Sequence, residues 1–178
     1  MTDDRIRTPG YHPLVKTLHW LVTLLLLVIW PLGFMQRMVK DEFYAPINFW
    51  HVTLGITLFW LVLARVVARL STGAPPVRDR APAWTHRLAN VVQALLYVAL
   101  IVQPILGLLT SDAQGFPLKW FDVIPLPNPI AKSDAATRIL LTAHFTVAWL
   151  LFVLVALHVC GALYHHVLRR DDTLLRII

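Results

Sequence analysis

The chain has 178 residues, the size of one domain, but 57% of them are hydrophobic and only 15% are charged. Together with a mean hydropathy of +0.63, this balance excludes an ordinary soluble domain and indicates a membrane protein. A single cysteine, Cys160, excludes an intramolecular disulfide and a cysteine-ligated metal cluster. The formal charge of +6 does not indicate nucleic-acid binding, because the basic residues are scattered rather than gathered on one polar face.

Four stretches free of Asp, Glu, Lys and Arg follow one another along the chain: residues 17–36, 43–64, 88–111 and 139–168. Each reaches the ~20 residues that a helix needs to cross a hydrocarbon core of ~30 Å. We expect one transmembrane domain over residues 1–178, with helices at about 14–36, 46–70, 84–110 and 136–168. The sequence therefore predicts an all-α membrane protein, a four-transmembrane-helix bundle.

Prolines stand near the expected limits of these helices. Pro13 precedes the first helix, Pro46 the second and Pro82 the third. Pro104 lies inside the third stretch, where we expect a kink of the kind that membrane helices tolerate. The first apolar stretch is too long for a cleaved signal peptide and no small-residue cleavage site follows it, so we expect it to remain in the mature protein.

The lysines and arginines outside the helix centres predict the orientation of the chain in the membrane. If both termini are cytoplasmic, eleven of these residues lie on the inner side and five on the outer side, an excess that favours this orientation. The inner residues are Arg5, Arg7, Lys16, Arg65, Arg69, Arg78, Arg80, Arg87, Arg169, Arg170 and Arg176. The outer residues are Arg37, Lys40, Lys119, Lys132 and Arg138. We therefore expect a multi-pass membrane protein with both termini cytoplasmic.

Four histidines lie inside the expected spans, where ionisable side chains are costly and indicate a function: His19, His51, His144 and His158. His144 and His158 are fourteen residues apart on one helix. This spacing keeps them within ~40° of the same face and separates them by ~21 Å along the axis. His51 lies near the outer end of the second helix, and His19 lies near the inner end of the first. Depth therefore pairs His51 with His144 and His19 with His158.

Two neutral imidazoles from facing helices suit a six-coordinate haem iron, because the porphyrin supplies four nitrogens and leaves two axial positions. The core of a helix bundle is a usual place for such a cofactor. Zinc normally takes three or four protein ligands, and no carboxylate or thiolate lies beside either pair. The histidines thus predict two haem b groups, one for each pair. For any single histidine, a hydrogen bond to a neighbouring helix is the alternative explanation.

Three further residues fit the haem interpretation. Gly55, one turn after His51, and Gly161, three residues after His158, would leave room for the edge of a porphyrin ring. Arg65 follows His51 by fourteen residues, so it lies on nearly the same face at the inner level and would pair with a haem propionate. A positively charged anchor at the inner surface is the equally supported alternative for Arg65.

The flanking segments suggest how substrates approach the two haems. The outer segment 114–133 is broken by prolines, so it should not be a helix, and its Lys119 and Lys132 would attract a small anion. A plain connector is the alternative. On the inner side His165, two turns beyond His158, would donate a hydrogen bond to a substrate carbonyl and deliver a proton, unless it belongs to a basic cluster that anchors the helix end.

Several short pieces of the chain match one family in order. They are Leu18 to Leu21, Ile47 to Val52 with Gly55, Arg65 and Arg69, Gln103 to Gly107, His144 and His158, and His165-His166 followed by Asp171 to Arg176. On these pieces the sequence resembles the bacterial cytochrome b561 family, which is related to the cytochrome b subunits of nickel-iron hydrogenases. The resemblance implies that His19 and His158 ligate the inner haem iron and that His51 and His144 ligate the outer one, in agreement with their depths.

One member of that family oxidises superoxide at the outer face and reduces ubiquinone within the membrane. The resemblance therefore implies an oxidoreductase of the bacterial inner membrane, a di-haem electron carrier coupled to the quinone pool. Its partners would be membrane lipid, quinone and a periplasmic electron donor. Superoxide as that donor would approach past Lys119 and Lys132, and the quinone would bind at His165. Two alternatives stay open: a haem-binding anchor that passes electrons for a dehydrogenase or a soluble cytochrome, and a cofactor-free helix bundle whose histidines relay protons. Nucleic acid is not an expected partner.

Overall fold

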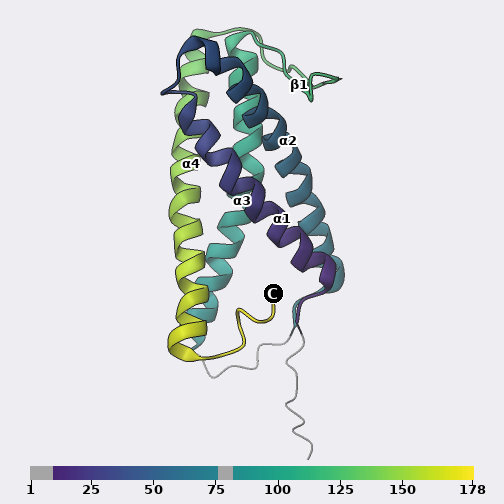
Figure 1. Ribbon diagram of the computed structural model, residues 1–178, viewed down its shortest axis with the longest axis vertical. Coiled ribbons are helices and arrows are strands. Elements are labelled where there is room, and N and C mark those ends of the chain that lie inside the picture. Colours follow the sequence, from purple (N-terminus) through teal and green to yellow (C-terminus); the bar gives the residue numbers. More distant parts are fainter. Residues whose placement is uncertain (1–9, 76–81) are drawn as a thin grey trace, which may run out of the picture.

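The computed structural model describes residues 10–75 and 82–178, and four long helices dominate this part of the chain. They are α1 (Pro13–Met35), α2 (Asp41–Thr72), α3 (Ala83–Gln114) and α4 (Asp134–Leu163). Each is long and apolar enough to cross a bilayer, as the sequence predicted. Figure 1 shows that they run side by side along the long axis of the molecule, with α1 crossing the bundle obliquely. The predicted class, a four-transmembrane-helix bundle, is confirmed.

The bundle has two distinct ends. A two-stranded antiparallel hairpin, β1 (Lys119–Trp120) and β2 (Ile124–Pro125), lies in the connector between α3 and α4. We call the end that carries it the hairpin end (top of Figure 1) and the opposite end the tail end. The hairpin end corresponds to the side expected to be outer. Of the basic residues expected on the inner side, Arg5, Arg7, Arg78 and Arg80 lie outside the described residues, and the other seven lie at the tail end.

Local sequence explains where the helices begin and where they tolerate proline. Pro13 occupies the first position of α1, where its missing N–H is not needed, and His12 Nδ1 accepts a hydrogen bond from Leu14 N. The helix α2 begins at Asp41, ahead of the expected position 46, so Pro46 lies inside it. Pro104 lies inside the continuous helix α3, and Pro31 lies inside α1 as well. Each removes one helical N–H from the hydrogen-bonding pattern.

The helices pack mainly as two pairs, α1 with α2 and α3 with α4, and α2 also contacts α3. Buried apolar side chains from all four helices meet at mid-height, among them Val22, Val62, Leu100 and Leu151. Many large apolar side chains remain exposed, such as Leu27, which is 66% exposed. An exposed apolar surface is expected where lipid, and not water, surrounds a helix bundle.

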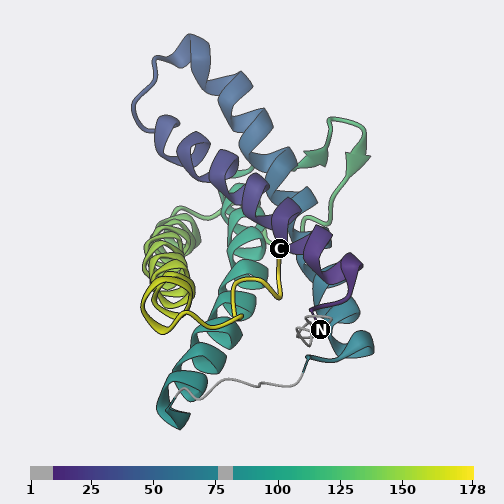
Figure 2. The same ribbon diagram turned by 60° about the horizontal axis from the view of Figure 1, so that its bottom comes forward.

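The last part of the chain closes the tail end. The helix α4 continues without a break into a π-helical segment, Tyr164–Arg169, and Arg170 then turns the chain with a positive φ of 53°. Residues 170–178, which we call the tail, run from there toward the start of α1 (Figure 2). Backbone carbonyls of the tail accept hydrogen bonds from Tyr11 N, Lys16 Nζ and Trp20 Nε1. The tail thus ties the end of α4 to α1.

Candidate functional site

The structure brings together both histidine pairs that their depths predicted. The ring centroids of His51 on α2 and His144 on α4 are 6.3 Å apart. Those of His19 on α1 and His158 on α4 are 6.2 Å apart. All four side chains are half-buried between the helices. The first pair forms the hairpin-end site and the second pair the tail-end site, and α4 contributes one histidine to each.

The geometry of both pairs fits a metal held between two imidazoles. A metal–imidazole bond of about 2 Å on each side of an iron places the two ring centroids about 6 Å apart, as observed here. Within the described residues, no group of three or more His, Cys, Asp or Glu side chains is arranged to hold a metal ion. Two protein ligands per site suit haem iron, whose other four ligands come from the porphyrin, better than they suit zinc.

A cavity of about 680 Å³ surrounds the hairpin-end site, within the usual size range of ligand pockets. Its wall includes His51, His144 and Gly55, and no atom lies within 4 Å of the position that a Cβ on Gly55 would take. Two buried polar atoms in the wall, Thr53 Oγ1 and Gln103 Oε1, have no hydrogen-bond partner among the residues that the structure describes. An open glycine surface and unpartnered polar groups fit a site that a large cofactor completes.

The imidazoles of the hairpin-end site are held by backbone carbonyls of neighbouring helices. His51 Nδ1 lies 3.1 Å from the carbonyl oxygen of Ile29 on α1, and His144 Nδ1 lies 3.1 Å from that of Gln103 on α3. A carbonyl only accepts, so each Nδ1 must donate its N–H. This arrangement assigns the proton to Nδ1 and leaves the Nε2 lone pair for iron.

Arg65 lies at the tail-end site. Its guanidinium donates a hydrogen bond to the Val15 carbonyl and lies over the Tyr97 ring, and it is within electrostatic range of both His19 and His158. In the part of the chain that the structure describes, Arg65 forms no ion pair with a carboxylate. A half-buried cation beside two imidazoles is suitably placed for the propionate that the sequence suggested. At the position of Gly161, a Cβ would meet no atom within 4 Å.

Lys119 lies in the hairpin and lines the same cavity as His51 and His144. The hairpin is fastened to α2 by a hydrogen bond from Trp120 Nε1 to Thr57 Oγ1. Asp122 also lines the cavity, so its carboxylate opposes the charge of Lys119. Lys132, the other predicted anion-attracting residue, packs its side chain close to Gly115 and is not among the residues that line this cavity.

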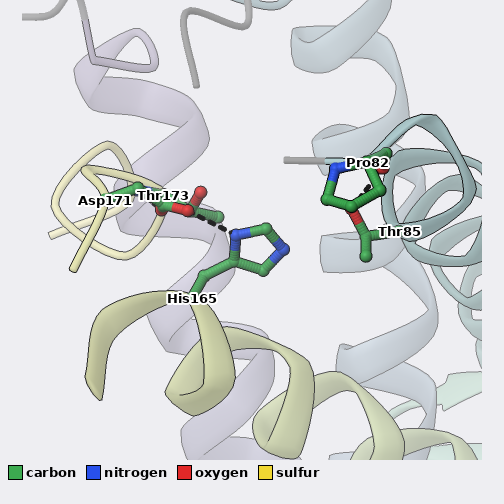
Figure 3. Close-up of polar contacts among 5 residues, drawn as sticks. All are labelled: Pro82, Thr85, His165, Asp171 and Thr173. Atoms are coloured by element: carbon green, nitrogen blue, oxygen red, sulfur yellow. Dashed lines mark hydrogen bonds and ion pairs between the residues drawn. The ribbon is translucent and has the colours of Figure 1, made fainter. Parts of the chain in front are cut away.

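His165 lies in the π-helical segment at the tail end and is only 8% exposed. Its Nδ1 lies 2.6 Å from Asp171 Oδ2, and Asp171 Oδ1 accepts a hydrogen bond from Thr173 N (Figure 3). The other edge of the imidazole faces the start of α3, where the His86 ring lies 6.4 Å away between centroids. A carboxylate at Nδ1 orients the ring and leaves Nε2 for another partner.

The pKa of Asp171 reflects the same contacts. Burial raises the pKa of this carboxyl, but the hydrogen bonds from Thr173 and His165 together outweigh burial and hold the pKa below its ordinary value. Asp171 is therefore ionised at neutral pH, and its carboxylate holds the imidazole of His165 through Nδ1.

Three elements of these sites were not assigned a role from the sequence: the carbonyls of Ile29 and Gln103, and the Asp171 carboxylate. Backbone carbonyls carry no residue signature, so the first two could not be found by residue type. Asp171 had a usable signal, since it follows His165 by six residues just beyond the end of a helix.

A bilayer-spanning four-helix bundle that presents two facing imidazole pairs at different depths defines a class of protein, the membrane cytochromes b. The sequence model of this family, prokaryotic cytochrome b561, matches residues 10–178, and the chain belongs to that family. The family is one of membrane electron-transfer proteins, and it implies haem b as the cofactor. The predicted family membership and the oxidoreductase class are thereby confirmed at this level.

Individual relatives agree with the family assignment. The chain is 30% identical over 174 residues to cytochrome b561 homolog 2 of Escherichia coli, an alignment that covers 94% of this chain and 90% of the relative. It is 27% identical over 161 residues to a probable superoxide oxidase, CybB, of Yersinia pestis. This alignment covers 90% of this chain and 91% of the relative. It is 26% identical over 176 residues to cytochrome b562 of Cereibacter sphaeroides, which covers 96% of each chain. The similarity therefore extends over nearly the whole chain.

Proposed function

We propose that this protein carries two haem b groups and transfers electrons from superoxide to ubiquinone. The observation that carries the proposal is the pair of bis-imidazole sites, one near each end of a bundle that spans the membrane. His51 and His144 would hold the haem at the hairpin end, and His19 and His158 the one at the tail end. When bound, the haems supply one-electron carriers on both sides of the membrane core.

The reaction balances with two superoxide anions for each quinone. Each superoxide loses one electron and becomes dioxygen, and ubiquinone gains two electrons and two protons to become ubiquinol. The chain must therefore admit a small anion at one site, and it must bind a lipophilic quinone and supply protons at the other. The printed name of the Yersinia pestis relative supports superoxide as the donor.

The hairpin end suits the entry of the anion. Lys119 lines the cavity together with both histidines, so its ammonium contributes a positive potential at the mouth of the site. The bond from Trp120 to Thr57 holds the hairpin in this position. Phe121 and Asp122 both have a positive φ, of 52° and 57°, which gives the hairpin a tight turn of the type favoured between antiparallel strands.

The tail end suits the quinone. His165 follows His158 by seven residues on one continuous helical segment, and its Nε2 edge faces away from Asp171. An imidazole oriented in this way would donate a hydrogen bond to a quinone carbonyl and pass on a proton, while Asp171 holds the ring in position. Protons would enter from the cytoplasm, because we propose that the tail end faces inward across the bacterial inner membrane. The excess of basic residues expected on that side supports this orientation.

A turnover assay with the purified protein tests the proposal. Superoxide generated by xanthine oxidase is supplied with a short-chain ubiquinone, and quinol formation is followed with and without superoxide dismutase. The proposal predicts quinol formation that depends on this protein and is abolished by the dismutase. Haem-loaded protein without turnover would instead support an electron-transfer anchor for a dehydrogenase or soluble cytochrome, and protein without haem would support a histidine proton relay.

A further inference from the structure

We propose that α1 and α3 position the two imidazoles of the hairpin-end site by the same device, which we call the carbonyl–glycine clamp. One clamp consists of the Ile29 carbonyl and Gly33 on α1 and holds His51. The other consists of the Gln103 carbonyl and Gly107 on α3 and holds His144. The inference rests on the proposed function, because it concerns residues that act through the axial ligands.

The clamp on α1 contacts His51 at two atoms. The Ile29 carbonyl accepts the hydrogen bond from His51 Nδ1 at 3.1 Å. A Cβ on Gly33 would lie 2.8 Å from His51 Cε1 and 3.3 Å from Nδ1, so any larger residue would push the ring from its place. Gly33 follows Ile29 by one helical turn, which puts the carbonyl and the bare Cα on the same side of α1.

The clamp on α3 repeats this arrangement with a different helix pair. The Gln103 carbonyl accepts from His144 Nδ1 at 3.1 Å, and a Cβ on Gly107 would lie 3.2 Å from His144 Cε1. The spacing from carbonyl to glycine is again four residues. Two separate helices thus contact two separate histidines at the same two ring atoms, Nδ1 and Cε1. A chance packing contact does not explain this repetition.

The clamps fix both the proton and the plane of each ring. The hydrogen bond keeps the proton on Nδ1 and makes Nε2 a stronger ligand, and the glycine allows the ring edge to lie against the backbone. The two ring planes are held 77° apart. Ligand basicity and ring orientation set the electronic structure of a bis-imidazole haem iron, so the clamps determine the spectrum and the potential of the hairpin-end haem.

Substitution of the glycines tests the clamp. In Gly33→Ala, we expect the EPR signal and midpoint potential of the hairpin-end haem to shift, or its signal to be lost, while the tail-end haem is unchanged. Gly107→Ala should shift the same haem less, because its contact of 3.2 Å needs a smaller displacement than the 2.8 Å contact at Gly33. The His144→Ala variant identifies which signal belongs to the hairpin-end haem.

Gly161→Ala is the matched control, since a Cβ there meets no atom within 4 Å. It should leave the hairpin-end haem unchanged. Unchanged spectra in both Gly33→Ala and Gly107→Ala would overturn the clamp, and so would equal changes in both haems. If Gly33→Ala does not fold, the milder Gly107→Ala decides on the same criteria. Haem analysis of the wild-type protein keeps the two proposals apart, because two haems with insensitive glycines refute only the clamp.

Discussion

The hairpin-end and tail-end sites each contain two histidines, and the distance between the two ring centroids is almost the same in both sites. The surroundings of the two pairs differ. At the hairpin end both Nδ1 atoms are bonded to backbone carbonyls, and the site opens into a cavity. At the tail end, within residues 10–75 and 82–178, no hydrogen bond to a ring nitrogen of His19 or His158 is seen, and the cation Arg65 lies nearby. The tail-end site is also stabilised by the tail, which follows α4 and accepts hydrogen bonds from Lys16 and Trp20 on α1.

Because of this difference, two similar histidine pairs would give their haem irons different potentials. A hydrogen bond donated by Nδ1–H raises the basicity of the imidazole and stabilises the oxidised iron, whereas a nearby cation stabilises the reduced iron. The arrangement therefore predicts a lower potential for the hairpin-end haem than for the tail-end haem. Electrons would then run downhill from the hairpin end to the tail end, in the direction of the proposed reaction.

The largest effect should come from the ligands themselves. His51→Ala or His144→Ala should remove the hairpin-end haem, and His19→Ala or His158→Ala the tail-end haem, because each iron loses one of its two protein ligands. The haem content per chain and the low-temperature absorption spectrum of each purified variant measure this. Loss of the same haem from all four variants would refute the pairing.

Arg65→Gln should shift the potential of the tail-end haem downward and leave the hairpin-end haem unchanged. The guanidinium is half-buried near both tail-end histidines, so its removal disfavours the reduced, more negative state. A redox titration of each haem measures the shift. Arg69→Gln is the control, since Arg69 lies one turn further along α2 and over the Tyr11 ring. Equal shifts in the two variants would point to general surface charge instead of a specific contact.

Asp171→Asn should lower the free energy of unfolding by an amount that depends on pH. The folded pKa of Asp171 is lowered, so its charge stabilises the fold above the unfolded pKa of about 3.9, and this contribution is lost as the pH falls through the folded pKa. We expect a loss of about 1.5–3 kcal/mol at pH 7, the usual range for a hydrogen bond to a charged group, and almost none in strong acid. Thermal unfolding in detergent at several pH values measures it.

A double-mutant cycle provides the control for Asp171. In a His165→Asn background the substitution Asp171→Asn should cost less, because the 2.6 Å contact is already gone. Additive losses would show that the two side chains do not act together.

The smallest effect concerns the charges at the mouth of the cavity. Lys119→Gln should lower the rate constant for superoxide a few-fold and Asp122→Asn should raise it, since the two residues line the same cavity with opposite charges. Both changes should shrink as salt is added, because exposed charges are screened beyond ~10 Å at 0.1 M ionic strength. Stopped-flow measurement at two salt concentrations tests this. Parallel changes in the two variants would exclude electrostatic steering.

The sequence predicted the four helices and the pairing of the histidines, because length, hydropathy and the helical rise determine which residues share a depth. It did not predict that α2 begins at Asp41 rather than near Pro46, because a proline inside a helix is tolerated at an energetic cost that composition does not show. The sequence also did not predict that the carbonyls of Ile29 and Gln103 accept hydrogen bonds from the histidines. Their role depends on how neighbouring helices are rotated, which only packing decides.

The sequence also did not predict the π-helical segment Tyr164–Arg169. The fourth helix was expected as one regular span to residue 168, but the chain changes to π geometry at Tyr164. A π-helix has more residues per turn, so the face of His165 cannot be deduced from its seven-residue separation from His158 alone. The contact between His165 and Asp171 therefore had to come from the structure.

The haem content of the purified wild-type protein shows whether both histidine pairs bind haem. Pyridine haemochrome analysis combined with a redox titration should give two haem b per chain with two resolved potentials, because the structure offers two bis-imidazole sites with different surroundings. Less than about one haem per chain, after expression with an adequate haem supply, would show that the two histidine pairs do not both ligate haem iron.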